Sequence, residues 1–124
     1  MELGGHAPVI IFDDCDLDKA IKLSSTTKFR NAGQVCISPT RFYVQQGVYD
    51  RFVAGFAEAT KKIQVGNGLD AATIMGPLAN DRRPPAIEKL VADATAKGAR
   101  LLTGGERGEG GNFYQPTVLS DVPM

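Results

Sequence analysis

The strongest constraint on the fold is an alternation between short apolar runs and segments of helical periodicity. Pro8–Phe12 is a continuous apolar and β-branched run, and Arg41–Gln45 reads as a second one. Each run is followed by apolar residues spaced three or four positions apart, first toward Phe29 and then over residues 49–63. Strands that alternate with amphipathic helices favour a parallel sheet covered by helices. We therefore expect an α/β fold, a largely parallel sheet with flanking helices.

The first two helices carry local signals of their own. Asp14 or Asp16 can cap the first helix, because a side-chain carboxylate accepts a hydrogen bond from the first free backbone amides. The second helix has the clearest apolar stripe, formed by Tyr49, Phe52, Val53, Phe56, Thr60 and Ile63. The run Pro8–Phe12 has no polar alternation, which is typical of a strand covered on both faces.

The second half of the chain predicts one more helix and two more strands. The helix carries Ile87, Leu90, Val91 and Ala94 and closes at Lys97-Gly98. The pair Pro84-Pro85 leaves two alternatives: the helix begins at Pro84, or Asn80 caps it and the prolines bend it. Arg100–Thr103 and Phe113–Leu119 read as strands on either side of a glycine-rich surface loop.

Composition excludes several classes of partner. The 124 residues carry 14 basic and 14 acidic side chains, and the basic ones are scattered, so we expect no nucleic acid and no anionic membrane as partner. No apolar run approaches the roughly 20 residues of a spanning helix, and no secretory signal is present. We expect a cytoplasmic protein. Two cysteines and a single histidine predict free thiols and no metal site.

Glu2 and Cys36 are the candidate catalytic pair, 34 positions apart. Glu2 lies in the run Glu-Leu-Gly-Gly, and Cys36 closes the run Gly-Gln-Val-Cys. A cysteine thiolate is a strong nucleophile, and a carboxylate within reach can activate the water that hydrolyses a thioester. Most cysteines are buried and inert and most glutamates are solvated, so the flanking residues carry the argument.

Both runs, in this order and at this spacing, resemble the aldehyde dehydrogenase superfamily. The segments Met75-Gly76-Pro77-Leu78 and Gln115-Pro116-Thr117-Val118-Leu119 extend the resemblance over essentially the whole chain. The stretch from Lys28 to Cys36 is most similar to the succinate-semialdehyde dehydrogenase branch. The resemblance implies oxidation of an aldehyde, a semialdehyde such as succinic semialdehyde in particular, to the carboxylic acid through a Cys36 thiohemiacetal and thioester, with NAD or NADP as cofactor.

The resemblance also assigns further roles. Leu3 and Gly4 belong to the segment that passes along the nicotinamide, and Arg30 stands where the semialdehyde branch binds the substrate's distal carboxylate. The alternative for Arg30 is an exposed arginine that interacts with the helix dipole. Some members of that branch carry a second cysteine two places after the nucleophile; Ser38 occupies that position, so that redox switch is not expected.

Two other chemistry-bearing residues are assigned no role in the reaction. Cys15 stands among three aspartates, whose negative charges disfavour a thiolate, so we expect a poor nucleophile. His6 is expected to be structural or exposed. A cysteine hydrolase that uses His6 is an alternative, tested by its replacement with alanine.

The resemblance covers only part of a catalytic domain. Residues 1–124 are expected to form a single partial catalytic domain, with the cofactor-binding domain and the oligomerisation segment outside the chain and the parent a homo-oligomer. The isolated chain is expected to be inactive, because its chemistry needs a bound hydride acceptor and preorganised donors. The alternative from another class is a non-catalytic folding or binding module with a self-contained core.

Overall fold

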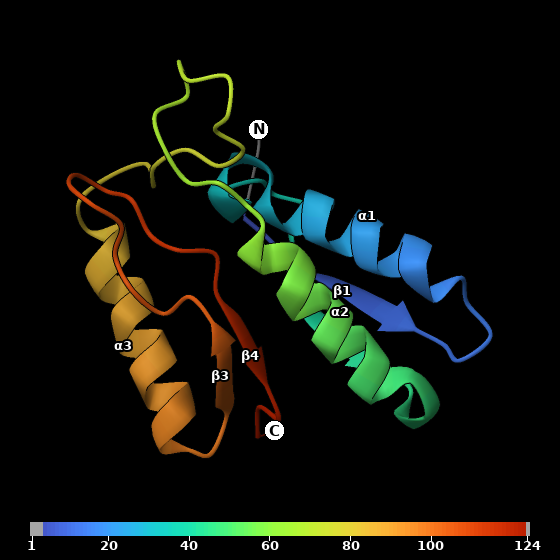
Figure 1. Ribbon diagram of the computed structural model, residues 1–124. Coiled ribbons are helices and arrows are strands. Elements are labelled where there is room, and N and C mark those ends of the chain that lie inside the picture. Colours follow the sequence, from blue (N-terminus) through green and yellow to red (C-terminus); the bar gives the residue numbers. More distant parts are fainter. Residues whose placement is uncertain (1–3, 124) are drawn as a thin grey trace. The chain divides into compact units, whose positions relative to one another are not determined.

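The computed structural model describes residues 4–123, and its chain divides into two compact units, residues 1–59 and residues 60–124 (Figure 1). Each unit combines helix and strand, which confirms the α/β class. The candidate catalytic segments both belong to the first unit.

The first unit contains a parallel pair of strands and two helices. Strand β1 (Ala7–Ile11) pairs with β2 (Pro39–Val44) in parallel, with Ala7 opposite Pro39. Between them runs α1 (Leu17–Phe29), and β2 leads through a short 3₁₀ turn into α2 (Tyr49–Lys61), whose last residues fall in the second unit. The parallel pairing follows from the crossover through α1, as the alternation of strand and helix predicts.

The Asp16 side chain caps α1, because one of its carboxylate oxygens accepts a hydrogen bond of 3.1 Å from the Lys19 backbone amide. Of the two candidate caps, Asp16 is therefore the one used. The cap sets where the helix begins, and the length of the helix then decides where the cysteine segment follows it.

An aromatic cluster joins the helices of the first unit to its sheet. Phe56 of α2 lies 6.2 Å from Phe29 of α1 and 5.0 Å from Phe42 of β2, measured between ring centroids. Phe52 packs beside Phe56 at 5.6 Å, and both are almost fully buried. These separations are typical of favourable aromatic pairs. The predicted apolar stripe of α2 is confirmed, since Phe52, Phe56 and Thr60 are its buried residues.

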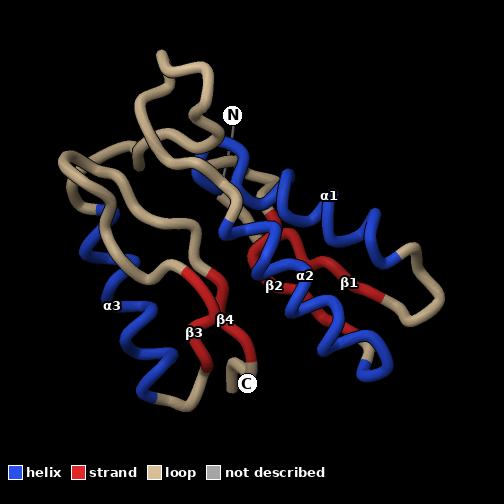
Figure 2. The backbone as a smooth tube through the Cα atoms, in the orientation of Figure 1, coloured by secondary structure: helices blue, strands red, loops and turns tan. Residues whose placement is uncertain are grey.

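The second face of the strand pair is not covered within the described residues. Ile10 and Tyr43 are 61% and 51% exposed, and Phe12, just beyond β1, is 59% exposed. The expectation of a strand covered on both faces is therefore wrong for residues 4–123. Figure 2 shows α1 and α2 lying along the same side of β1 and β2, which leaves the other side without a helix from this unit.

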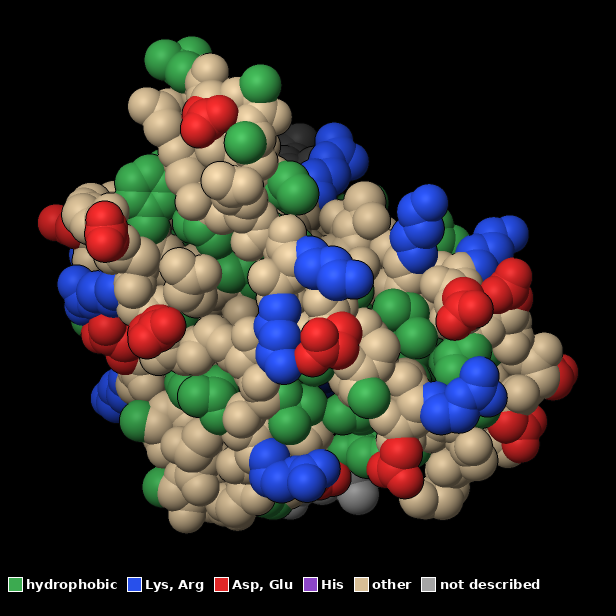
Figure 3. All heavy atoms as spheres, in the orientation of Figure 1, with side chains coloured by type: hydrophobic (Ala, Val, Ile, Leu, Met, Phe, Trp, Pro, Cys, Tyr) green, Lys and Arg blue, Asp and Glu red, His purple; other side chains and the backbone are tan. Residues whose placement is uncertain are grey.

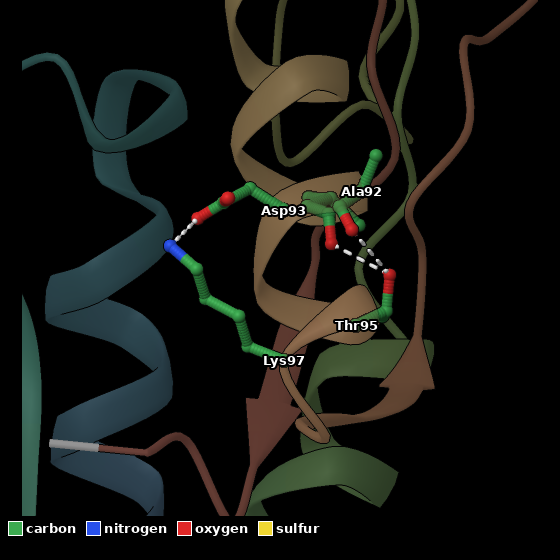
Figure 4. Close-up of polar contacts among 5 residues, drawn as sticks. Ala92, Asp93, Thr95 and Lys97 are labelled. Atoms are coloured by element: carbon green, nitrogen blue, oxygen red, sulfur yellow. Dashed lines mark hydrogen bonds and ion pairs between the residues drawn. The ribbon is translucent and has the colours of Figure 1, made fainter.

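The second unit combines α3 (Arg83–Ala96) with an antiparallel pair, β3 (Arg100–Thr103) and β4 (Val118–Ser120). Helix α3 has proline in its first turn, so the alternative in which the helix begins beside Pro84 agrees with the structure within one residue. At the other end Lys97 pairs with Asp93 at 2.8 Å, and the Thr95 hydroxyl donates to the backbone oxygens of Val91 and Ala92 (Figure 4).

Two expectations for this unit need correction. The strand expected over Phe113–Leu119 is shorter, because Pro116 has no amide hydrogen to donate and interrupts the ladder. Tyr114 forms only an isolated bridge to Arg107, and β4 begins at Val118. Leu90, expected on the apolar face of α3, is 66% exposed.

Candidate active site

Cys36 follows helix α1 and lies near the end of the strand pair at which both β1 and β2 begin. The helix ends at Phe29, a 3₁₀ turn spans Arg30–Gly33, and Cys36 follows three residues before Pro39, the first residue of β2. We call residues 30–38 the cysteine loop. Because β1 and β2 are parallel and Ala7 lies opposite Pro39, the residues that precede Ala7 reach this same end of the strand pair.

The Glu-Leu-Gly-Gly run lies beside the cysteine loop at its described end. A Cβ atom placed on Gly5 would lie 3.5 Å from the Cys36 carbonyl oxygen, which is an ordinary van der Waals contact. The backbone at Gly5 therefore lies next to the backbone at Cys36. Glu2 and Leu3 lie outside the described residues. The structure thus brings together the two segments that carry the candidate pair, from positions more than 30 residues apart.

Gly4, which follows Leu3 as the second of the two expected cofactor-binding positions, is exposed and has open space around it. A Cβ atom placed on Gly4 would meet no described atom within 4 Å. A backbone that is uncovered on this side leaves room for a flat ligand to approach it. The described part of the run is therefore compatible with a nicotinamide next to the cysteine loop.

The cysteine loop has an unusual backbone. Asn31, Ala32 and Gly33 have positive φ angles of 50°, 54° and 74°. Gly33 tolerates this region without cost and asparagine visits it readily, whereas an alanine there is strained. Strain of this kind is retained where surrounding contacts hold it in place.

Two amide side chains hold the turn. The Asn31 side-chain amide donates to the Gln34 backbone oxygen at 3.2 Å, and the Gln34 side-chain amide donates to the Asn31 backbone oxygen at 3.1 Å. The Gln34 backbone amide donates to the same Asn31 oxygen at 3.0 Å. These three hydrogen bonds fix the turn that ends two residues before Cys36, and this turn restricts the position of the thiol.

Lys28 reaches from α1 into the loop. Its ammonium donates to the Ser38 hydroxyl at 3.5 Å, and that hydroxyl donates to the Lys28 backbone oxygen at 3.3 Å. Ser38 is only 3% exposed. Burial lowers the pKa of the Lys28 ammonium from its ordinary value, because removal from water disfavours the charged form.

Arg30, the expected substrate-binding residue, is exposed at the end of α1. Its position at the start of the cysteine loop places the guanidinium on the same segment as Cys36. Its backbone leaves the helical region at this point, with ψ of 129°. Both the carboxylate-binding role and the helix-end role are compatible with this exposed position.

Cys15 and Cys36 are both partly buried thiols, and they are not joined to each other by a disulfide bond. Cys15 lies in the turn between β1 and α1, at the other end of that helix from the cysteine loop. His6 Nδ1 lies 2.9 Å from the Thr40 hydroxyl, joining the segment before β1 to β2. A cross-strand contact of this kind fits the structural role expected for His6.

Other classes of site receive no support from the described residues. Within residues 4–123 no three His, Cys, Asp or Glu side chains gather into a group that could hold a metal ion. No helix in the same range is long and apolar enough to cross a membrane. On the face drawn in Figure 3, basic and acidic side chains are intermixed rather than gathered into one patch.

Residues 1–124 match the sequence model of the "Aldehyde dehydrogenase family". The chain belongs to the aldehyde dehydrogenase family. This confirms the resemblance on which the catalytic assignments rest, and it makes the chain part of an oxidoreductase family.

Known members of the aldehyde dehydrogenase family are closely similar over the whole chain. The NADP(+) succinate-semialdehyde dehydrogenase GabD of Escherichia coli is 52% identical over 124 residues, which cover 99% of this chain and 26% of that protein. The 3-sulfolactaldehyde dehydrogenase of Pseudomonas putida is 47% identical over 123 residues, which cover 98% of this chain and 25% of that protein. The crystal structure of succinate-semialdehyde dehydrogenase from Burkholderia pseudomallei superposes with a TM-score of 0.95 at 46% identity, over 99% of this chain and 26% of that one.

The chain therefore spans about a quarter of the length of the aldehyde dehydrogenases it matches. The structure also adds residues that sequence reasoning missed, namely Lys28, Asn31 and Ser38. Asn31 and Gly33, both residue types that adopt positive φ readily, were a signal for this turn that could have been used. The contact of Lys28 with Ser38 had no signal in the sequence, because it joins residues ten positions apart across a non-repetitive loop.

Proposed function

We propose that the protein oxidises an aldehyde that carries a distal anionic group, succinic semialdehyde or a similar semialdehyde, to the carboxylic acid. The observation that carries this proposal is the contact between the Gly5 segment and the Cys36 backbone, since it brings the base-bearing run to the nucleophile-bearing loop. Family membership supplies the reaction class.

Cys36 is the proposed nucleophile. Its thiolate adds to the aldehyde carbon and forms a thiohemiacetal; loss of hydride from that carbon leaves a thioester on Cys36. The cross-linked turn of Asn31 and Gln34 supports this role, because a nucleophile held in one geometry loses less freedom on the way to the transition state. The Cys36 backbone amide is a candidate donor to the developing oxyanion.

Glu2 is the proposed general base. Its carboxylate takes a proton from the water that attacks the Cys36 thioester, and the carboxylic acid product leaves while the thiol is restored. A second proposed function of Glu2 is to assist deprotonation of Cys36 through a water. Both functions require the Glu-Leu-Gly-Gly run to lie at the cysteine loop, and the position of Gly5 supports that arrangement.

NAD or NADP is the proposed hydride acceptor, with Leu3 and Gly4 as the residues of this chain that would lie along the nicotinamide. When bound, the nicotinamide accepts the hydride that leaves the substrate carbon. The open space around Gly4 is compatible with that contact. A homo-oligomeric parent, which the family resemblance implies, and a cytoplasmic location, which the composition of the chain favours, belong to the same proposal.

Arg30 is the proposed partner of the substrate's anionic end. A guanidinium binds a carboxylate through two parallel hydrogen bonds, which fixes orientation as well as charge. The named substrates of two similar proteins, succinate semialdehyde and 3-sulfolactaldehyde, both combine an aldehyde with an anionic group. An exposed arginine at the start of the cysteine loop is well placed to select such substrates.

Substrate selection is tested by the ratio of kcat/KM for succinic semialdehyde over butanal, in the parent protein and in Arg30→Ala. We expect a ratio well above ten that falls by roughly 10- to 100-fold in the variant, the loss typical of a charged hydrogen bond. Arg41→Ala is the matched control, since Arg41 is exposed on β2 of the same unit. A ratio near one in the parent and in both variants would indicate a general aldehyde dehydrogenase. It would also favour the alternative role of Arg30, an exposed arginine that interacts with the helix dipole.

The roles of Cys36 and Glu2 are separated by the intermediate that each variant accumulates. With substrate and cofactor, Glu2→Gln should turn over about 10²- to 10⁴-fold more slowly and retain an acyl group on the tryptic peptide 31–41, because hydrolysis lacks its base. Cys36→Ser should form no such adduct and no product. An acylated peptide in Cys36→Ser, or full turnover in Glu2→Gln, would contradict these assignments.

The alternative of a self-contained binding module receives less support. Ile10, Phe12 and Tyr43 expose a row of apolar side chains on one face of the strand pair, and such a face is costly in water. A module that functions by itself would be expected to cover it.

A further inference from the structure

Lys28 makes two linked contacts across the cysteine loop. Its ammonium donates to the Ser38 hydroxyl, and the same hydroxyl donates back to the Lys28 backbone oxygen, at 3.5 and 3.3 Å. Ser38 also donates its backbone amide to Val35 at 2.9 Å. The two residues stand at the two ends of the loop, so their contact joins the end of α1 to the start of β2 around Cys36.

The Lys28 side chain also packs against the strained turn. A Cβ atom placed on Gly33 would lie 3.2 Å from the Lys28 Nζ atom and 3.3 Å from the Lys28 backbone oxygen. Gly33 and Ser38 flank Cys36 by three and two residues. Consecutive Cα atoms are 3.8 Å apart, so the ammonium is within roughly 10 Å of the Cys36 backbone.

We propose that Lys28 is a positioning residue for Cys36, which braces the cysteine loop through Ser38 and Gly33 and places a positive charge near the thiolate. The inference rests on the proposed role of Cys36 as nucleophile and names a residue that supports it. A positive charge close to a cysteine favours its thiolate over its thiol, and the effect is larger in a partly buried setting than in water.

The surroundings of the loop favour such an effect. Lys28 is half-buried, so its charge is screened less than that of a surface lysine. Besides Cys36, the ionisable side chains of residues 4–8 and 30–41 are His6, Arg30 and Arg41, and Glu2 lies outside the described residues. The contacts of Lys28 with Ser38 and with Gly33 lie inside the loop itself.

The test is the rate at which iodoacetamide alkylates Cys36 as a function of pH, read by mass spectrometry on the tryptic peptide 31–41. Cys15 on peptide 1–19 of the same molecule is the internal reference. In Lys28→Met we expect alkylation of Cys36 to slow by roughly three- to tenfold near pH 7, with the midpoint of its pH profile moved upward. Cys15 should be unchanged.

Two further variants make the result specific. Lys28→Arg keeps the charge and should stay near the parent rate. Lys22→Met is the matched control, because Lys22 is an exposed lysine about 9 Å further from the loop along α1. If Lys28→Met alkylates Cys36 within twofold of Lys22→Met, the proposal is overturned.

If Lys28→Met does not fold, an NMR measurement on the parent protein tests the proposal instead. With ¹³C-labelled lysine, the Lys28 Cε resonance should show a titration step at the pH where Cys36 ionises, and Cys36→Ser should abolish that step. No step would overturn the proposal. Neither readout uses aldehyde or cofactor, so a failed proposed function appears as absent turnover, and a failed Lys28 role appears as unchanged alkylation.

Discussion

At the scale of single residues, the three positive φ angles before Cys36 are the most informative feature. Gly33 is suited to this conformation, and Asn31 compensates through its side-chain hydrogen bond. Ala32 has neither advantage, because its Cβ atom crowds the following carbonyl in the left-handed region. A strained residue four positions from a proposed nucleophile indicates that the geometry of the loop is held at some cost in stability.

Replacing Ala32 with glycine should therefore stabilise the chain. We expect Ala32→Gly to raise the free energy of unfolding by about 0.5–1 kcal/mol, because relief of strain exceeds the added entropy of the unfolded glycine. Urea unfolding followed by circular dichroism measures the change. Ala54→Gly, in the exposed part of α2, is the control and should lower the free energy by about 1 kcal/mol. Equal losses in both variants would show that Ala32 is not strained.

At the scale of elements, two contacts organise the second unit. The first is the turn after β3, where Gly104 has φ of 75° and its backbone lies against the Pro116 carbonyl. The Gly105 amide donates to the Thr117 hydroxyl at 2.9 Å in the same turn. The second is a bidentate ion pair that joins α3 to the loop before β4, in which Arg107 meets Glu88 at 2.6 and 2.9 Å.

Gly104→Ala should destabilise this unit strongly. The added methyl group would overlap the Pro116 carbonyl and force a positive φ on alanine, so we expect a loss of about 2–4 kcal/mol. Gly68→Ala is the matched control, because a Cβ atom at Gly68 would meet nothing within 4 Å and its φ is not in the left-handed region. Chemical denaturation measures both. A loss below 1 kcal/mol for Gly104→Ala would contradict the packing described.

Acid should weaken the link between α3 and the loop. The hydrogen bonds from Arg107 lower the pKa of Glu88 below its ordinary value of 4.5, so the folded state holds the carboxylate more tightly in its charged form. The ion pair stabilises the folded state fully at pH values above the ordinary pKa of a glutamate. This stabilisation is lost as the pH falls through the lower pKa that Glu88 has in the folded state. We expect the melting temperature of Glu88→Gln to fall less than that of the parent between pH about 5 and pH about 3. Glu109→Gln, an exposed carboxylate of the same unit, should behave like the parent.

At the scale of the whole molecule, the chain carries the segment of an aldehyde dehydrogenase that includes the proposed nucleophile, base and anion-binding arginine. It spans about a quarter of the relatives it matches. Within the first unit the parallel register of β1 and β2 brings two distant motifs to one edge, and the second unit contributes a helix and an antiparallel pair with its own core.

Residues 1–124 by themselves should show no cofactor-dependent turnover. The reaction needs a bound hydride acceptor and several fixed donors, and this chain offers only Leu3 and Gly4 toward a nicotinamide. Absorbance of NADH or NADPH with succinic semialdehyde measures the outcome. Production that requires both Glu2 and Cys36 would overturn this prediction, whereas production without that requirement would indicate a contaminating enzyme.

Sequence alone determined the α/β class, the apolar stripe of α2 and the family, because these depend on local periodicity and on motifs that are contiguous in the chain. It offered Asp14 and Asp16 as caps of α1, and the structure selected Asp16. The sequence also predicted Cys36 as the centre of the chemistry, a role that stays a prediction. Tertiary structure decided the rest. The exposed face at Ile10 and Tyr43, the short β4 and the contact of Lys28 with Ser38 all depend on which distant segments pack together, and residue spacing along one chain does not encode that packing.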